Sequence, residues 1–171
     1  MEYQFNDNFL WGAASSGPQS EGTFPGDGKA EMEWDYWFKQ VPEQFFDGVG
    51  PSVTSDFYHK YKEYAKLMKE IGIQGYRFSI SWSRIFPEGT GKVNEKGVTF
   101  YQAVIDEFLS QGIEPVICLH HFDMPMYWME KGGFENRETA EGFAAFAAKC
   151  FELFGGKVKR WITFNEPIVI A

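Results

Sequence analysis

One unit is repeated along most of this chain: an amphipathic helix that stops at a glycine and is followed by a strand-like run. The three helices end at Gly72, Gly112 and Gly155, at intervals of about 40 residues. Helices and strands that alternate in this way are typical of βα units in a parallel sheet. The repeat therefore restricts the chain to the α/β folds.

The helices are predicted from apolar residues at three- and four-residue spacing. The first follows the candidate N-cap residues 54–56, the second follows Asn94 and the third follows Asn136. The runs that follow are rich in β-branched and aromatic residues, and they predict strands over residues 73–82, 115–119 and 158–164.

A further strand is expected over residues 9–15, and the Gly- and Pro-rich residues 17–52 after it are expected to form a long loop. Four βα strands are half of a (β/α)₈ barrel, whose usual length is about 250 residues. We therefore predict an α/β fold that is the N-terminal half of a TIM barrel, with strands 1 to 4. Because no low-complexity linker divides the chain, residues 1–171 are expected to be one partial barrel without a second domain.

Composition excludes several classes of function. The net charge is −8, which argues against nucleic acid as a partner. No apolar run approaches the roughly 18 residues of a membrane span, and the start of the chain is polar and acidic, unlike a secretory signal. A cytoplasmic location is expected. Cys118 and Cys150 are too few for a disulfide framework and lack the spacing of a zinc site, so we expect buried thiols.

Sites in parallel α/β sheets gather beyond the carboxyl ends of the strands. Seven polar residues stand within or just beyond the predicted strands: Gln19, Arg77, His120, His121, Asp123, Asn165 and Glu166.

Glu166 ends the fourth strand and precedes a proline. Held there against aromatic side chains, its carboxyl would have a pKa raised by desolvation, which suits a general acid. The spacing alone equally permits a solvated strand end.

His120 and His121 are adjacent in an extended strand, so their side chains should point to opposite faces, and a shared metal ion is not expected. We expect one imidazole to face the barrel mouth and to bind a ligand, while the other packs outward. Arg77 should point into the barrel, where a carboxylate partner is expected, either as a structural salt bridge or as a catalytic group.

Five motifs in this chain resemble those of a known enzyme family. They are residues 9–14 (FLWGAA), 19–22 (QSEG), 76–87 (YRFSISWSRIFP), 121–125 (HFDMP) and 163–167 (TFNEP). In these motifs the chain resembles the N-terminal part of glycoside hydrolase family 1, which contains retaining β-glucosidases and 6-phospho-β-glycosidases. The resemblance implies a (β/α)₈ barrel that cleaves β-glycosidic bonds with two glutamates through a covalent glycosyl intermediate.

Carried over by motif, Glu166 is implied to be the acid/base and Asn165 to bind the sugar 2-hydroxyl. Gln19 and His121 are implied to bind other sugar hydroxyls, and Arg77 to lie beside the nucleophile. The resemblance implies no metal and no organic cofactor. The expected partner is a small molecule, either a (phospho)disaccharide or an aryl β-glucoside, and the oligomeric state is left open.

Two departures from the common β-glucosidase pattern favour the 6-phospho-β-glucosidases. Phe122 stands where many β-glucosidases have Trp, and residues 16–18 (SGP) precede Gln19 where a Tyr-Gln pair is common. The nucleophile and the phosphate-binding residues of the family would lie beyond Ala171, so the isolated chain is expected to be inactive. The alternatives are a β-glucosidase or β-galactosidase that acts on unphosphorylated sugars, and a non-catalytic half-barrel that binds a sugar or pairs with another half.

Overall fold

The computed structural model of the chain describes residues 3–170. In this part of the chain, strands in the order β1-β2-β3-β4 form one parallel sheet. The strands are β1 (Gly12–Ala14), β2 (Gly75–Ser79), β3 (Glu114–His120) and β4 (Arg160–Phe164). Sequential order means that each strand lies beside the next strand in the chain, as in a barrel and unlike a doubly wound sheet.

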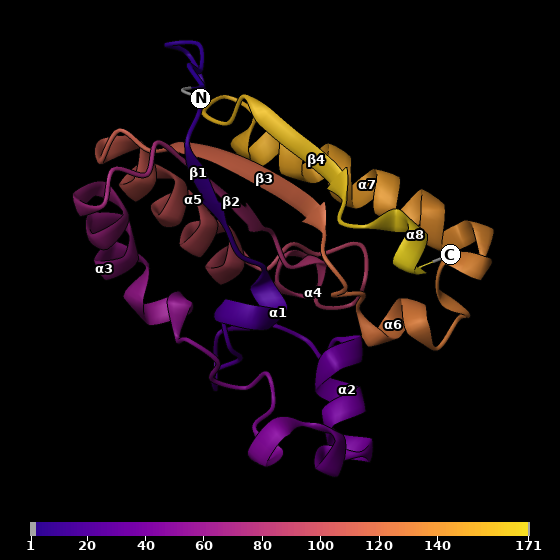
Figure 1. Cartoon of the computed structure of the whole chain (residues 1–171). Helices are drawn as coiled ribbons and strands as arrows, with labels where there is room; N and C mark the ends of the chain where they lie inside the picture. The colour runs from indigo at the N-terminus through magenta and orange to yellow at the C-terminus, as the bar shows by residue number, and fades with distance from the viewer. Residues whose placement is uncertain (1–2, 171) are drawn as a thin grey trace.

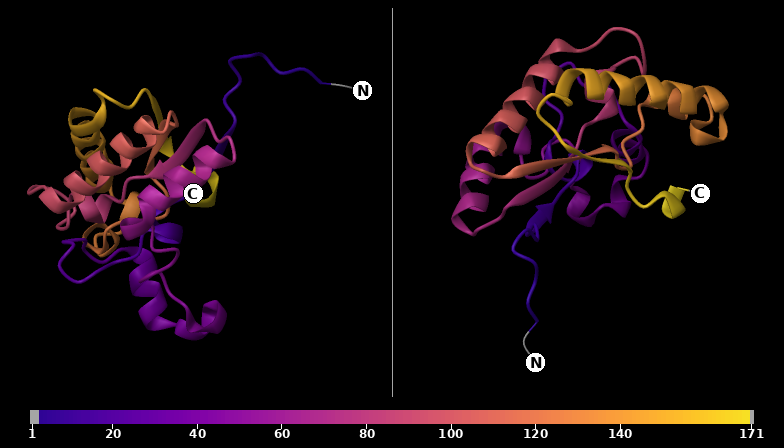
Figure 2. Two further views of the ribbon diagram at one scale, coloured as in Figure 1. Left: turned by 90° about the vertical axis from the view of Figure 1, so that its left-hand side faces the viewer. Right: turned by 90° about the horizontal axis from the view of Figure 1, so that it is seen from above.

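Long helices connect the strands, and they are α3 (Phe57–Glu70), α5 (Glu95–Ser110) and α7 (Arg137–Phe154). Right-handed crossovers between consecutive strands place successive helices on the same face of the sheet. The views agree with this rule, since α5 and α7 lie together on one side of the curved sheet (Figures 1 and 2). The three predicted helix–strand units are therefore confirmed, although the strand expected over residues 73–82 is shorter: β2 spans Gly75–Ser79, and a short helix begins at Trp82.

Helix ends follow the sequence signals closely. Asn94 Oδ1 accepts a hydrogen bond from the Lys96 N–H at 3.2 Å, and Asn136 Oδ1 accepts one from the Glu138 N–H at 3.0 Å. Gly72 follows α3 with a φ of +82°, a backbone conformation that glycine adopts without strain. Asp56 occupies the N-cap position of α3, but its side chain makes no capping hydrogen bond.

Shorter helices lie in the connections. They are α1 (Gly17–Ser20), α2 (Glu33–Gln40), η1 (Pro42–Gln44), η2 (Phe46–Gly48), α4 (Trp82–Ile85), α6 (Met126–Met129), η3 (Gly133–Glu135) and α8 (Pro167–Ile170).

The sequence reading of residues 9–52 is partly wrong. The first strand is shorter than residues 9–15, and the expected loop over residues 17–52 contains two α-helices and two 3₁₀ turns. Helix α2 was missed because its start does not carry a typical N-cap residue. Instead, the side chain of Asp35 within α2 accepts the Met32 N–H at 3.2 Å.

The core lies between the sheet and the long helices, and it is built largely from aromatic rings. Tyr76 and Phe78 of β2 pack against Phe108 of α5, with ring centroids 4.9 and 6.2 Å apart. Trp82 stacks on Phe146 of α7 at 5.3 Å. Cys118 and Cys150 are free, buried thiols, as expected. Aromatic residues make up 19% of the chain, and many of them therefore serve the core.

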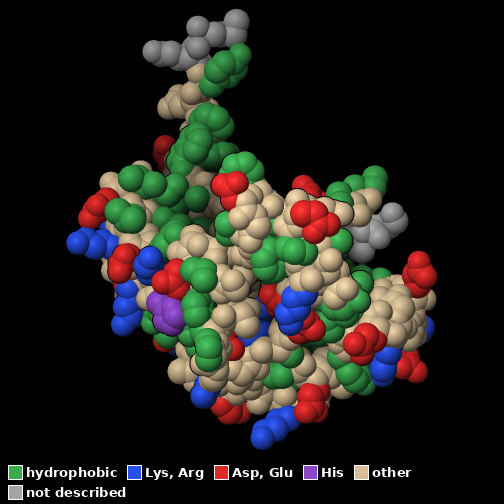
Figure 3. All heavy atoms as spheres, turned by 90° about the horizontal axis from the view of Figure 1, so that it is seen from below, with side chains coloured by type: hydrophobic (Ala, Val, Ile, Leu, Met, Phe, Trp, Pro, Cys, Tyr) green, Lys and Arg blue, Asp and Glu red, His purple; other side chains and the backbone are tan. Residues whose placement is uncertain are grey.

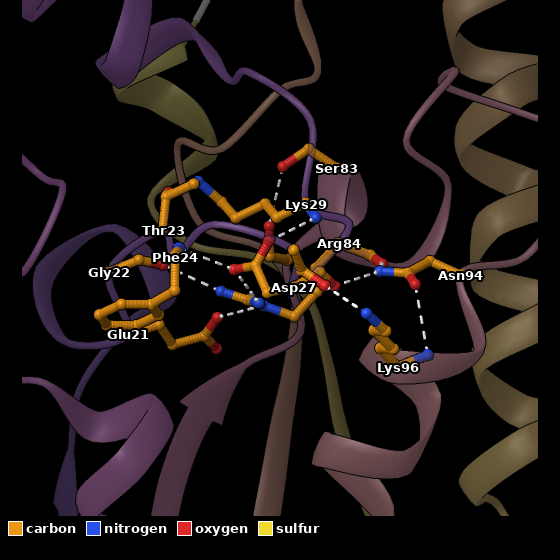
Figure 4. A network of polar contacts seen from close by, with 12 residues as sticks. Glu21, Gly22, Thr23, Phe24, Asp27, Lys29, Ser83, Arg84, Asn94 and Lys96 are labelled. Atoms are coloured by element: carbon orange, nitrogen blue, oxygen red, sulfur yellow. Dashed lines mark hydrogen bonds and ion pairs between the residues drawn. The ribbon is translucent and has the colours of Figure 1, made fainter.

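A buried network joins the β1–α3 connection to this core (Figure 4). The Arg84 guanidinium is fully buried, and it donates to Glu21 Oε2 at 3.1 Å, to Asp27 Oδ2 at 2.9 Å and to the Gly22 carbonyl at 2.9 Å. The Tyr101 hydroxyl of α5 donates to Glu21 Oε1 at 2.8 Å. Because an unpaired buried charge is costly, each member of the network depends on the others.

No helix in residues 3–170 combines the length and the apolar character that a membrane crossing requires.

The Arg84 network leads to a stability prediction. Replacing Arg84 by Met fills similar space but leaves the Glu21 and Asp27 carboxylates buried without their cation. We expect the free energy of unfolding of the full-length protein that contains this chain to fall by about 3–5 kcal/mol, measured by urea denaturation.

The matched control is Arg137→Met. Arg137 pairs with Glu141 at 3.7 Å, and the two side chains are 86% and 70% exposed. Its loss should change the free energy of unfolding by no more than about 0.5 kcal/mol. Similar values for the two variants would contradict the structural role assigned to Arg84.

Candidate active site

Four of the five candidate site residues meet at the carboxyl ends of β2, β3 and β4. Arg77 Nη2 donates to Asn165 Oδ1 at 2.7 Å and contacts Cys118 Sγ at 3.4 Å. Asn165 Nδ2 in turn donates to Glu166 Oε2 at 3.4 Å. The Asn165 backbone N–H donates to the His120 carbonyl at 2.9 Å, which extends the pairing of β3 and β4 up to the site.

The expected carboxylate partner of Arg77 is not found. Among residues 3–170, no acidic side chain forms an ion pair with Arg77, and its strongest contact is the neutral amide of Asn165. The Arg77 Nε atom is buried and has no hydrogen-bond partner in the described residues. The side chain is only partly buried, so water can solvate part of its charge. The guanidinium therefore keeps unused donor capacity at the site.

The two adjacent histidines separate as expected for an extended strand. His120 is 2% exposed and packs edge-on against Phe134 and Phe143, and it also contacts Phe164 at 5.3 Å between ring centroids. His121 is partly exposed, and it is close enough to Arg77 and Glu166 for both charges to act on its ring. His121 is therefore the more accessible of the two imidazoles.

Both imidazoles are held neutral. Burial, and then the neighbouring His121, lower the pKa of His120 to about 4. Burial, and then the positive charge of Arg77, lower the pKa of His121 to about 4, against an opposing effect of the Glu166 carboxylate. A neutral His121 presents one donor and one acceptor, which suits hydrogen bonding to a hydroxyl group.

Glu166 is exposed at the end of β4, so the desolvation expected from the sequence is not present in residues 3–170. Its backbone has a φ of +45°, in the left-handed region, which costs a non-glycine residue about 1–3 kcal/mol. Pro167 follows and begins α8, and the Val169 N–H donates to the Glu166 carbonyl at 2.9 Å. Strain of this kind is often retained at functional positions.

Gln19 lies in α1, beyond the carboxyl end of β1, and is exposed. Its Oε1 accepts the Ser16 hydroxyl at 2.8 Å, and the Gly17 N–H donates to Ser79 Oγ at the end of β2 at 2.7 Å. These bonds fix α1 at the same edge of the sheet as the other candidates. In the described residues, Gln19 makes no hydrogen bond to Arg77, His121, Asn165 or Glu166.

An apolar groove of about 1440 Å³ borders the site. Its lining includes Trp34 and Trp37 of α2, together with Phe122, Phe134 and Pro167. No Lys or Arg of residues 3–170 lines it. Viewed from below, the side toward which the strands run, the surface mixes acidic, basic and hydrophobic side chains without a continuous basic patch (Figure 3). The groove suits an uncharged, flat group better than a phosphate.

Asp123 is one of the polar residues at the predicted strand ends, but the sequence predicts no role for it. In the structure Asp123 is fully buried, and its Oδ1 accepts the His121 N–H at 3.1 Å. The signal that could have found it is its position two residues after the ligand-facing histidine.

The lowered histidine pKa values give a titration prediction. The ring proton signals of His120 and His121 should stay constant from pH 8 to pH 5 and should shift only near pH 4 in an NMR titration of the full-length protein. The variants His120→Gln and His121→Gln assign the two signals. A midpoint near the ordinary histidine value of about 6.5 would contradict the burial of these rings.

The family model described as "Glycosyl hydrolase family 1" matches residues 1–171. The chain is 52% identical over 168 residues to the 6-phospho-beta-glucosidase GmuD of Bacillus subtilis (strain 168), covering 98% of this chain and 36% of that protein. It is 46% identical over 167 residues to Beta-glucosidase A of Acetivibrio thermocellus, covering 98% and 37% of the two chains.

Among solved structures, a beta-glucosidase from Thermotoga maritima in complex with cyclophellitol superposes with a TM-score of 0.92 at 43% identity. The alignment covers 97% of this chain and 38% of that one. The chain therefore spans just over a third of the length of the relatives it matches.

Proposed function

Since the chain belongs to glycosyl hydrolase family 1, we propose that the protein containing it is a retaining β-glycosidase that hydrolyses 6-phospho-β-glucosides. The four-stranded sheet is part of a (β/α)₈ barrel of that family. The observation that carries the proposal is the cluster of Arg77, His121, Asn165 and Glu166 at the carboxyl ends of three strands. The chain spans just over a third of its relatives, so the activity and the substrate of the whole protein are part of this proposal.

Glu166 is the acid/base of the proposed reaction. It protonates the departing glycosidic oxygen, and it then deprotonates the water that hydrolyses the glycosyl intermediate. Its exposed carboxyl at the end of β4 is accessible to both the leaving group and water. A second glutamate, the nucleophile, is supplied by another part of the barrel, and the two-glutamate reaction uses no metal or organic cofactor.

Asn165 binds the sugar 2-hydroxyl. Its Oδ1 accepts from Arg77, so the amide is held in one orientation and its Nδ2 remains the donor that faces Glu166. A hydrogen bond to the 2-hydroxyl can strengthen as charge develops at the neighbouring carbon. The free donor capacity of Arg77 serves the nucleophile carboxylate of the complete barrel, which explains why no carboxylate pairs with Arg77 in residues 3–170.

Gln19 and His121 bind other hydroxyls of the same sugar. The Gln19 Oε1 atom is occupied by Ser16, which leaves its amide N–H groups for a ligand. His121 is neutral, so it can donate and accept without placing a positive charge beside the sugar.

The 6-phospho preference is supported by the identity of 52% to a protein named 6-phospho-beta-glucosidase and by Phe122 and the SGP run at residues 16–18. The groove beside the site has no cationic lining in residues 3–170, so the phosphate is held by Lys or Ser donors elsewhere in the whole protein. We place the enzyme in the cytoplasm, where phosphorylated sugars accumulate. The second candidate is a β-glucosidase for unphosphorylated sugars, which the identity of 46% to Beta-glucosidase A favours.

The acid/base role is tested with Glu166→Gln in the full-length protein. A glucoside with an alkoxide leaving group should lose about 10²–10⁴ in rate, because this leaving group needs the proton. An activated aryl glucoside should lose less and should accumulate the covalent intermediate. Azide, which needs no general base, should restore turnover and yield the β-glycosyl azide, measured by product analysis.

Other roles give other results. If Glu166 were the nucleophile, reaction with every leaving group would stop and azide would yield the α-configured product. If it were a solvated strand end, kcat would stay within a few-fold of the unaltered protein.

The phosphate preference is tested by comparing kcat/KM for an aryl β-glucoside with and without a 6-phosphate. We expect a clear preference for the phosphorylated substrate, because buried phosphate donors are left unpaired by the plain sugar. Equal values would refute the phosphate assignment and leave the family membership intact.

A further inference from the structure

The turn that places His121 is strained. Phe122, between His121 and Asp123, has a φ of +54°, a conformation that bulky residues rarely adopt. Such a backbone persists only where surrounding contacts hold it. Phe122 is the second residue after β3 and follows His121 directly, so a contact that holds its backbone also affects where the His121 imidazole points.

The Asp123 carboxylate makes one such contact. Its side chain is 0% exposed, and Oδ1 accepts the His121 N–H at 3.1 Å, which closes a ring around Phe122. The same Oδ1 lies 3.6 Å from His120 Nδ1. Neither Asp123 Oδ2 nor His120 Nδ1 has a hydrogen-bond partner among the described residues. The polar contacts that the described residues give this carboxylate are therefore with His121 and His120.

Burial of the ionised Asp123 carboxylate destabilises the fold. Desolvation by burial raises the pKa of Asp123 to about 7, and the hydrogen bond from the His121 N–H acts in the opposite direction. The charges of Glu33 and Glu21 raise it further, and Lys29 lowers it. A folded-state pKa above the unfolded value means that stability is lost as pH rises toward 7 and the buried carboxyl ionises. A neutral amide would fill the same space without that cost, so stability alone does not explain an aspartate here.

We infer that Asp123 is a positioning residue that acts through His121. Its carboxylate holds the His121 backbone in the strained turn, and this directs the His121 imidazole toward Arg77 and Glu166. The inference rests on the proposed function, because His121 is there the group that binds a sugar hydroxyl. A charged acceptor binds an N–H more strongly than a neutral one, which is the reason for a carboxylate at this place.

The experiment uses Asp123→Asn in the full-length protein at pH 8. The amide keeps the shape but removes the charge, so the turn should loosen while the fold persists. We expect kcat/KM for an aryl 6-phospho-β-glucoside to fall about tenfold, the difference between a charged and a neutral acceptor. Urea denaturation should show equal or greater stability, because the buried charge is gone.

Thr139→Val is the control. Thr139 of α7 belongs to the same β3–β4 connection, is 0% exposed, and its Oγ1 has no hydrogen-bond partner among the described residues; it does not line the groove. Removing this buried hydroxyl should leave kcat/KM within about twofold. An equal loss in both variants would show a general effect of the connection and would overturn the inference.

A double-mutant cycle tests whether Asp123 acts through His121. In a His121→Ala background, Asp123→Asn should lower kcat/KM by less than about twofold. The same tenfold loss in both backgrounds, or no loss in the unaltered background, would overturn the inference.

A readout that needs no turnover separates this inference from the proposed function. The His121 backbone amide proton, identified in ¹⁵N-histidine-labelled protein by its loss in His121→Ala, should move upfield in Asp123→Asn. An unmoved signal would overturn the positioning role even in an active enzyme. Absence of hydrolysis of any β-glycoside by the unaltered full-length protein would instead refute the proposed function, and the amide signal would still decide the contact.

Discussion

The buried pairing of Arg84 with Glu21 and Asp27 is the interaction on which the site end of this structure depends. Its members come from distant parts of the chain, and Arg84 joins the long connection after β1 to the short helix after β2. Glu21 directly follows α1, the helix that carries Gln19. A long connection has little hydrophobic core of its own, so a fully enclosed cation gives it one position that a purely apolar contact would not specify as sharply. The cost of enclosing three charges is offset by their mutual attraction and by the Tyr101 and Gly22 hydrogen bonds.

A second arginine, Arg77, lies at the carboxyl ends of the strands, and its surroundings differ from those of Arg84. Arg77 faces an amide instead of a carboxylate and remains only partly buried. Its charge therefore stays available, and after burial, the larger cause, it is the second cause that lowers the pKa of His121. The result is a site with a fixed cation, a neutral imidazole and an exposed carboxyl, all within reach of one another. This combination can bind hydroxyl groups and exchange a proton with a ligand.

Backbone strain appears beside two of the candidate residues. Phe122 and Glu166 both have positive φ values, and each comes two residues after the end of its strand, β3 or β4. In each case the chain leaves a regular strand and turns sharply, which presents a polar side chain at the mouth of the sheet. The strands supply the rigidity that such turns require, because their ladders continue to the last residues before the turn, as the pairing of His120 with Phe164 shows.

The sequence by itself determined the local elements: helices α3, α5 and α7, the strands that follow them and the strand ends that bear polar residues. These features depend on periodicity and on caps such as Asn94 and Asn136, which lie within a few residues of what they specify. The motifs also indicated the family. Only the tertiary structure decided which side chains pair with one another. Helix α2 was missed because its start carries no typical cap, Arg77 was expected to meet a carboxylate and instead meets Asn165, and Asp123 showed its contact with His121 only once the turn was built. Pairings such as Arg84 with Glu21 join residues about 60 positions apart, and only the register of the assembled strands brings such residues within hydrogen-bonding distance.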